Sequence, residues 1–140
     1  MNQEIDTHQG GCLCGAVRYE IRGKPEWSAH CHCRSCQKAL GAAFATWCKV
    51  KSENFRVTKG SIQTCETSRG VERGFCGTCG TSLTYDAKQE VEGQNWQGEA
   101  WFSAATLDDP DIASPKSHVY ICNQQPWIKL DDGLPTFREF

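Results

Sequence analysis

The chain has 140 residues, 39% of them hydrophobic, and a formal net charge of −2, which predicts one globular domain covering residues 1–140. Its 15 basic residues nearly balance its 17 acidic residues and form no basic block, which argues against a nucleic-acid partner. No apolar run approaches the roughly 20 residues that cross a bilayer, and the N-terminus shows no leader pattern, so we expect a cytoplasmic protein without a membrane partner.

Short strands dominate the predicted secondary structure. Residues 16–23 alternate apolar and charged side chains, which places Val17, Tyr19 and Ile21 on one face of a strand. Further runs rich in β-branched and aromatic residues predict strands over 42–50, 54–60, 61–68, 71–76, 81–86, 98–107 and 117–122. This pattern predicts a small, antiparallel, all-β fold.

The remaining segments predict one helix and two irregular connections. Residues 34–41 form a helical stretch of about two turns that ends at Gly41, a residue suited to a C-terminal cap. Residues 87–97 are polar and predict a surface loop, and residues 107–118 contain two prolines, which argue against regular structure.

Seven of the 10 cysteines fall into three clusters along the chain. The clusters are Cys12-x-Cys14, Cys31-x-Cys33-x2-Cys36 and Cys76-x2-Cys79. Because cytosolic thiols stay reduced, clustered cysteines there are typical of metal sites rather than disulfides. Zinc takes four protein ligands at structural sites and three at catalytic sites, so seven thiols divide naturally into four and three.

The four-ligand site is predicted from the glycines around the third cluster. Cys76 and Cys79 have the form of a zinc knuckle, in which Gly77 and Gly80 let backbone amides turn toward the thiolates. A knuckle supplies two ligands and needs a second pair. Cys12 and Cys14, which lie just before the first strand, can supply that pair, and the resulting closed site would join the N-terminal strand to a central hairpin.

The other three cysteines, Cys31, Cys33 and Cys36, are close enough in sequence to reach one metal ion together. The fourth position is open to water, substrate or a histidine. Alternation along an extended segment points His32 away from the metal, so a supporting or solvent-facing role is favoured for His30 and His32. The alternative is a closed structural site completed by one of the single cysteines, Cys48, Cys65 or Cys122.

Five motifs in order resemble the glutathione-dependent formaldehyde-activating family, which includes centromere protein V-like proteins. They are GGCLCGAVRYE (10–20), CHCRSCQKALG (31–41), FCGTCGTSL (75–83), LDDP (107–110) and HVYICNQQPW (118–127). The resemblance implies a tent-like zinc fold related to methionine-R-sulfoxide reductases, with two zinc ions per chain. It implies a structural zinc at Cys12, Cys14, Cys76 and Cys79 and a catalytic zinc at Cys31, Cys33 and Cys36.

The activity implied by the resemblance is that of a carbon–sulfur lyase, which forms S-(hydroxymethyl)glutathione from glutathione and formaldehyde. The expected partners are a glutathione-like thiol and an aldehyde. Zinc suits this chemistry because a coordinated thiol ionises readily. The rival interpretation is a carrier or sensor that binds zinc or thiols without turnover. The oligomeric state and the general base are left open.

Other residues carry weaker hypotheses. Arg34 and Lys38 are candidates for pairing with an anionic substrate, and Cys122 before Asn123 is a candidate redox thiol, although an inert thiol is the simpler interpretation. Four tryptophans are candidates for the wall of a pocket over the catalytic zinc. They are Trp47, Trp96, Trp101 and Trp127, and we expect Trp127 to be at least partly buried.

Overall fold

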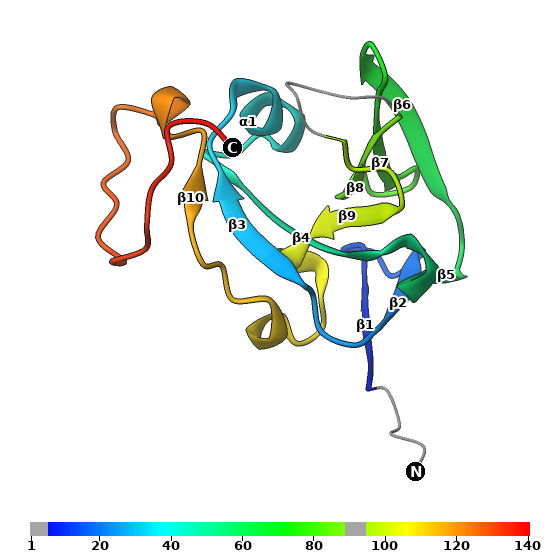
Figure 1. The fold of residues 1–140 in the computed structure, drawn as a ribbon. Helices are drawn as coiled ribbons and strands as arrows, with labels where there is room; N and C mark the ends of the chain where they lie inside the picture. Colours follow the sequence, from blue (N-terminus) through cyan, green and yellow to red (C-terminus); the bar gives the residue numbers. More distant parts are fainter. Residues whose placement is uncertain (1–5, 89–94) are drawn as a thin grey trace.

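The computed structural model describes residues 6–88 and 95–140, which form two β-sheets and one short helix, α1 (Arg34–Leu40) (Figure 1). The smaller sheet is antiparallel, in the order β1 (Thr7–Gly11), β2 (Arg18–Arg22) and β5 (Phe55–Lys59). The larger sheet has the order β10 (His118–Val119), β3 (Trp27–Cys31), β4 (Ala45–Lys51), β9 (Glu99–Ser103), β8 (Ser82–Ala87), β7 (Val71–Cys76) and β6 (Ile62–Ser68). The described fold is therefore mostly β with one helix.

The predicted strands and the helix are confirmed, most of them with shorter bounds and β7 with the predicted bounds, and two strands were missed. Neither β1 nor β3 was predicted, because their sequences, THQGG and WSAHC, contain no β-branched run. The strand predicted over 117–122 ends at Val119, since Tyr120 takes a left-handed backbone conformation with φ of 57° and a 3-10 turn follows. Most of the predicted loop over 87–97 lies outside the described residues.

The helix and the irregular segment follow the prediction. Gly41 caps α1 with φ of 64°, a conformation that costs a glycine little. Residues 107–118 are irregular apart from a 3-10 turn at Pro110–Ala113 and the first residue of β10. No helix in the described part of the chain has the length and apolarity needed to cross a membrane.

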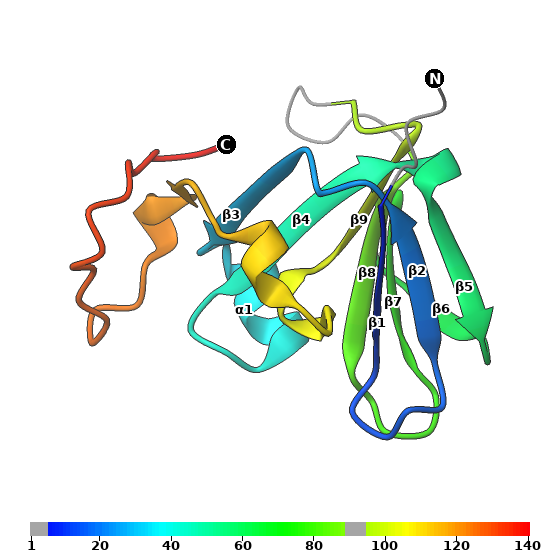
Figure 2. The ribbon, with the colours of Figure 1, turned by 90° about the horizontal axis from the view of Figure 1, so that it is seen from below.

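The main hydrophobic core lies between the two sheets. Tyr19 and Ile21 on β2 are buried with Cys48 and Val50 on β4 and Phe102 on β9. The predicted alternation along β2 is thereby confirmed. Figure 2 shows the smaller sheet alongside β7 and β8, with β3, β4 and α1 in the other half of the molecule.

The opposite face of the larger sheet carries a second apolar cluster. Alternation along a strand sends Trp47 on β4 and Trp101 on β9 to the face away from the main core. These rings join Cys31 at the end of β3 and Cys36 on α1. The C-terminal segment, orange to red in Figure 1, runs beside β10, where the amide of His118 donates to the Pro135 carbonyl at 2.9 Å.

Candidate metal centres and the cavity beside them

The fold brings the first and third cysteine clusters together. Cys12 and Cys14 lie in the turn between β1 and β2, and Cys76 and Cys79 lie at the end of β7 and in the turn that follows it. The Sγ atoms of Cys12 and Cys14 are 3.7 Å apart, and those of Cys14 and Cys76 are 3.9 Å apart. All four sulfurs lie within 4.8 Å of one another, as four ligands of one metal ion require.

Backbone amides point at the sulfurs of this quartet. The Val17 amide donates to Cys12 Sγ at 3.2 Å, and the Cys79 amide donates to Cys76 Sγ at 3.4 Å. The hydrogen bond from Val17 lowers the pKa of Cys12. Hydrogen bonds from the side chain and backbone of Thr81 lower the pKa of Cys79 to about 5. Cys12 and Cys79 thus favour the thiolate, the form that binds zinc, whereas burial and the hydrogen bonds with neighbouring thiols raise the pKa of Cys14 to about 11.

The second group consists of Cys31, Cys33 and Cys36, whose sulfurs also lie within 4.8 Å of one another. Cys31 ends β3, Cys33 is the N-cap of α1, and Cys36 lies on the first turn of that helix. The Cys36 amide donates to Cys33 Sγ at 3.4 Å. Cys31 and Cys36 are buried and Cys33 is half-buried, so Cys33 is where this trio meets solvent.

Two nitrogen donors reach the trio from the larger sheet. Trp47 Nε1 on β4 donates to Cys36 Sγ at 3.4 Å, and Arg73 Nη2 on β7 donates to the same sulfur at 3.7 Å. Hydrogen bonds from Cys31 and Cys33, with the positive charge of Arg73, lower the pKa of Cys36 to about 2. The hydrogen bonds among the three thiols, with burial, raise the pKa of Cys31 far above its usual value. Arg73 and Trp47 therefore favour the thiolate form of Cys36.

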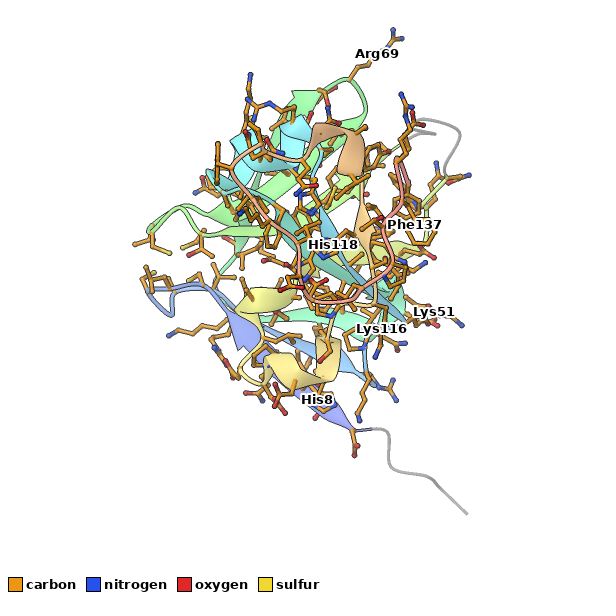
Figure 3. The ribbon with its side chains drawn as sticks, turned by 90° about the vertical axis from the view of Figure 1, so that its left-hand side faces the viewer. His8, Lys51, Arg69, Lys116, His118 and Phe137 are labelled. Carbon is orange, nitrogen blue, oxygen red and sulfur yellow. The ribbon has the colours of Figure 1, made fainter. Side chains whose placement is uncertain are left out.

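Neither nearby histidine joins the trio. His32 Nε2 lies 2.9 Å from His118 Nδ1, and His118 Nε2 lies 2.7 Å from Asp132 Oδ2. His30 groups instead with His118 and Asp132, and its Nδ1 lies 2.8 Å from Thr46 Oγ1. Figure 3 labels His118 in the middle of this side of the molecule, with Phe137 from the C-terminal segment nearby.

The single cysteines are also separate from both groups among the described residues. Cys48 lies in the main core, where its thiol contacts the Phe102 carbonyl at 3.7 Å and burial raises its pKa. Cys65 and Cys122 are exposed, and the Cys122 thiol lies 3.5 Å from Asn123 Oδ1. The structure brings no single cysteine to the trio to close it as a four-sulfur site.

A cavity of about 230 Å³ borders the trio, and seven aromatic residues are among those that line it. Three of the four predicted tryptophans line it, namely Trp47, Trp96 and Trp101. Trp127 does not: it is 67% exposed, so the expectation of its burial was wrong. Trp127 lines a different, shallow depression together with Arg34 and Lys38, which places both of these cations outside the cavity.

Arg73 is the cavity residue that sequence reasoning missed. Pairing across the sheet sets Arg73 on β7 opposite Tyr85 on β8 and Tyr85 opposite Trp101 on β9. The same row continues to Lys49 on β4 and Trp27 on β3. In the run VERGFC an arginine is expected to face solvent, and only the strand order reveals that this one is 7% exposed and faces a tyrosine.

The donor chemistry of both groups fits zinc. Four thiols with convergent amides suit a closed tetrahedral site, and three thiols beside a cavity suit a site with three protein ligands. Besides the group of His30, His118 and Asp132, the described fold therefore presents two cysteine clusters suited to a metal ion, one of four cysteines and one of three.

Comparisons with known proteins agree with this arrangement. The profile of a family described as glutathione-dependent formaldehyde-activating enzyme matches residues 7–123. An uncharacterized lyase of Schizosaccharomyces pombe is 34% identical over 86 residues, covering 58% of this chain and 58% of that protein, so the match spans little more than half of the relative's length. A crystal structure of a Rhodobacter sphaeroides protein superposes with a TM-score of 0.54 at 19% identity, covering 92% of this chain and 98% of that one, which shows a shared fold.

Proposed function

The chain belongs to the glutathione-dependent formaldehyde-activating enzyme family, and on this premise we propose that it is a zinc-dependent carbon–sulfur lyase. The proposed reaction joins a thiol to an aldehyde or splits the adduct, as an S-(hydroxymethyl)glutathione synthase does. Glutathione is the leading thiol and formaldehyde the aldehyde named by the family. We further propose a single domain with the tent-like zinc fold of methionine-R-sulfoxide reductases.

The two cysteine groups take different roles in this proposal. Cys12, Cys14, Cys76 and Cys79 would hold a structural zinc, and Cys31, Cys33 and Cys36 would hold a catalytic one. A zinc ion at the trio would lower the pKa of a thiol substrate and present it as a thiolate. The half-buried Cys33 marks the side from which that thiol would approach.

Arg73 and Trp47 support the charge of the trio. Three thiolates and one divalent ion sum to a charge of −1, and the guanidinium of Arg73, at 3.7 Å from Cys36 Sγ, offsets it. The indole N–H of Trp47 withdraws further charge from the same sulfur. Both contacts reduce the negative charge of the trio, so they weaken its repulsion of a negatively charged substrate.

A single observation carries the proposal. The trio has three converging sulfurs, the described residues provide it with no fourth cysteine, and it borders a cavity large enough for a small molecule. A purely structural site has no need of such a cavity beside an incomplete ligand set. The arrangement suits a centre whose remaining position belongs to a substrate.

The first test is zinc-edge X-ray absorption with metal content per chain, before and after adding glutathione. We expect two zinc ions per chain, and seven protein sulfurs shared by two ions give an average of 3.5 sulfurs per zinc. Glutathione should raise that average toward four. Formation of S-(hydroxymethyl)glutathione is measured in parallel by NMR against the uncatalysed rate.

The outcomes separate the interpretations. A rise in sulfur coordination with faster adduct formation supports the lyase. The same rise without any acceleration supports the thiol carrier or sensor. An average of four sulfurs before glutathione is added, and no change afterwards, supports two closed structural sites and contradicts the proposal.

A further inference from the structure

The cavity beside the trio is much larger than formaldehyde requires. It measures about 230 Å³. A protein cavity of about 150 Å³ with apolar walls is large enough to hold benzene. The cavity therefore has room for one aromatic ring with a few further atoms, and formaldehyde would leave most of it unfilled.

The walls favour a flat, apolar ligand. Seven aromatic residues line the cavity, namely Trp27, Trp47, Tyr85, Trp96, Trp101, Tyr120 and Phe140. Trp101 meets Trp27 edge to face with ring centroids 5.0 Å apart and meets Trp96 at 5.4 Å, so the wall is held by ring-on-ring packing. Such a surface is a poor match for the charged backbone of glutathione and a good match for an aromatic ring.

Two buried N–H donors in this wall have no acceptor among the described residues. Arg73 is 7% exposed, with Nη2 on Cys36 Sγ and its guanidinium over the Tyr85 ring at 5.0 Å, yet its Nη1 has no hydrogen-bond partner. Trp101 is 5% exposed, and its Nε1 is likewise without a partner. A buried donor without an acceptor destabilises the fold, and more so when it is charged. A ligand oxygen in the cavity would remove that cost.

Arg73 also carries the cavity's positive charge. Apart from the cysteines, it has the one permanently charged side chain among the residues that line the cavity. An oxygen that is negative, or that becomes negative during the reaction, is therefore the acceptor that this site favours.

We propose that this cavity binds the carbonyl partner of the reaction, that this partner is an aromatic aldehyde, and that its oxygen accepts hydrogen bonds from Arg73 Nη1 and Trp101 Nε1. The proposal rests on the proposed function, because it assigns the aldehyde substrate of the same site. It makes Arg73 a catalytic residue that touches the reacting oxygen.

The chemical step balances without an oxidant or a reductant. A lone pair of the thiolate sulfur forms the C–S bond, and the π pair of the carbonyl moves onto oxygen. The oxyanion then takes up the proton that the thiol released, which gives a hemithioacetal. In the reverse direction the same pairs return and the C–S bond breaks. Arg73 and Trp101 stabilise the oxyanion, and loss of one such donor costs about 10²- to 10³-fold in kcat.

Binding and turnover are tested separately on the zinc-loaded full chain. Benzoate serves as an unreactive probe that combines a ring with a negative oxygen, its binding is followed by tryptophan fluorescence, and acetate is the control without a ring. We expect benzoate to bind, acetate not to bind, and Arg73→Gln to weaken benzoate at least tenfold. Arg34→Gln, a charge-matched change on α1 outside the cavity, should leave benzoate binding unchanged.

Turnover is compared for benzaldehyde and formaldehyde with the same thiol, at equal zinc content in every variant. We expect kcat/KM to be higher for benzaldehyde and kcat for benzaldehyde to fall about 10²-fold in Arg73→Gln. Trp101→Phe removes the second donor while keeping a ring, so it tests the same site if Arg73→Gln fails to fold or to load zinc.

The two proposals fail in different ways. Turnover of formaldehyde, with no binding of benzoate and no reaction of benzaldehyde, overturns the assignment of the cavity and leaves the lyase standing. Benzoate binding that depends on Arg73, with no turnover of either aldehyde, overturns the lyase and keeps the ligand site. Equal benzoate affinity in the wild type, Arg73→Gln and Trp101→Phe overturns the role of the two donors.

Discussion

Replacing one cysteine in each metal centre should separate the two centres by their effect on stability. Cys76→Ser removes a ligand from the quartet, which ties together parts of the chain far apart in sequence. Cys33→Ser removes a ligand from the trio, which lies within one strand end and one helix turn. Serine is itself a good N-cap, so Cys33→Ser keeps the cap of α1.

The size of the difference follows from the loops that each centre closes. Cys14 and Cys76 are 62 positions apart, and closing a loop of that length is worth about 4 kcal/mol at 25 °C. The trio spans only residues 31–36, for which the same relation gives about 2 kcal/mol. With an unfolding entropy of about 0.3 kcal/mol per kelvin for 140 residues, these energies correspond to falls in Tm of about 14 °C and about 7 °C.

The assay combines zinc content per chain with differential scanning calorimetry under reducing conditions. We expect Cys33→Ser to retain one zinc ion, to unfold cooperatively and to lose adduct formation, and Cys76→Ser to show the larger fall in Tm. Cys65→Ser, a change at an exposed cysteine outside both centres, is the control and should alter neither quantity. Equal falls in Tm for the two ligand variants, or loss of both ions from Cys33→Ser, would refute the division.

Three further substitutions test the core and the support of the trio. Tyr19→Phe loses the 2.7 Å hydrogen bond to Thr106 Oγ1 and should cost about 1 kcal/mol in urea unfolding; an unchanged midpoint would contradict this. Phe102→Ala removes a fully buried ring between the sheets and should cost about 3–5 kcal/mol by the same measurement, and a cost under about 1 kcal/mol would show that the core is not continuous there. Trp47→Phe removes the N–H donated to Cys36 and should weaken zinc at the trio about 10- to 100-fold in competition with a chelator while the quartet keeps its ion; equal weakening at both centres would rule out a local effect.

The grouping of the cysteines was predictable because it follows from the number of ligands that zinc takes and does not require knowledge of the fold. Zinc needs four ligands at a closed site, the knuckle at Cys76 and Cys79 supplies two, and the pair at Cys12 and Cys14 can supply the other two. The same holds for α1, whose end at Gly41 is a local property of the sequence. Both predictions are confirmed by the positions of these residues in the described fold.

Strands β3 and β10 were harder to predict, because pairing with neighbouring strands stabilises them more than their own sequence does. The run WSAHC of β3 has little strand propensity of its own, and it becomes a strand between β4 and β10. β10 is only two residues long and pairs parallel to β3, a long-range contact that no local pattern indicates. Tyr120 then ends it through a backbone conformation that is unusual for a residue with a side chain.

The order of the strands in the larger sheet explains why Arg73 is buried. On an exposed strand, an arginine beside a glutamate is expected to be solvated, and β7 was predicted as a strand without any role for this residue. In the fold, β6 covers one edge of β7 and β8 the other, and the register sets Arg73 against Tyr85 and then Trp101. A buried guanidinium is stable only where charge or acceptors face it, and Cys36 Sγ supplies the charge on one side. Arg73 also lines the cavity, and its Nη1 has no partner among the described residues, so the residue that offsets the charge of the trio is also the one that we propose meets a substrate oxygen.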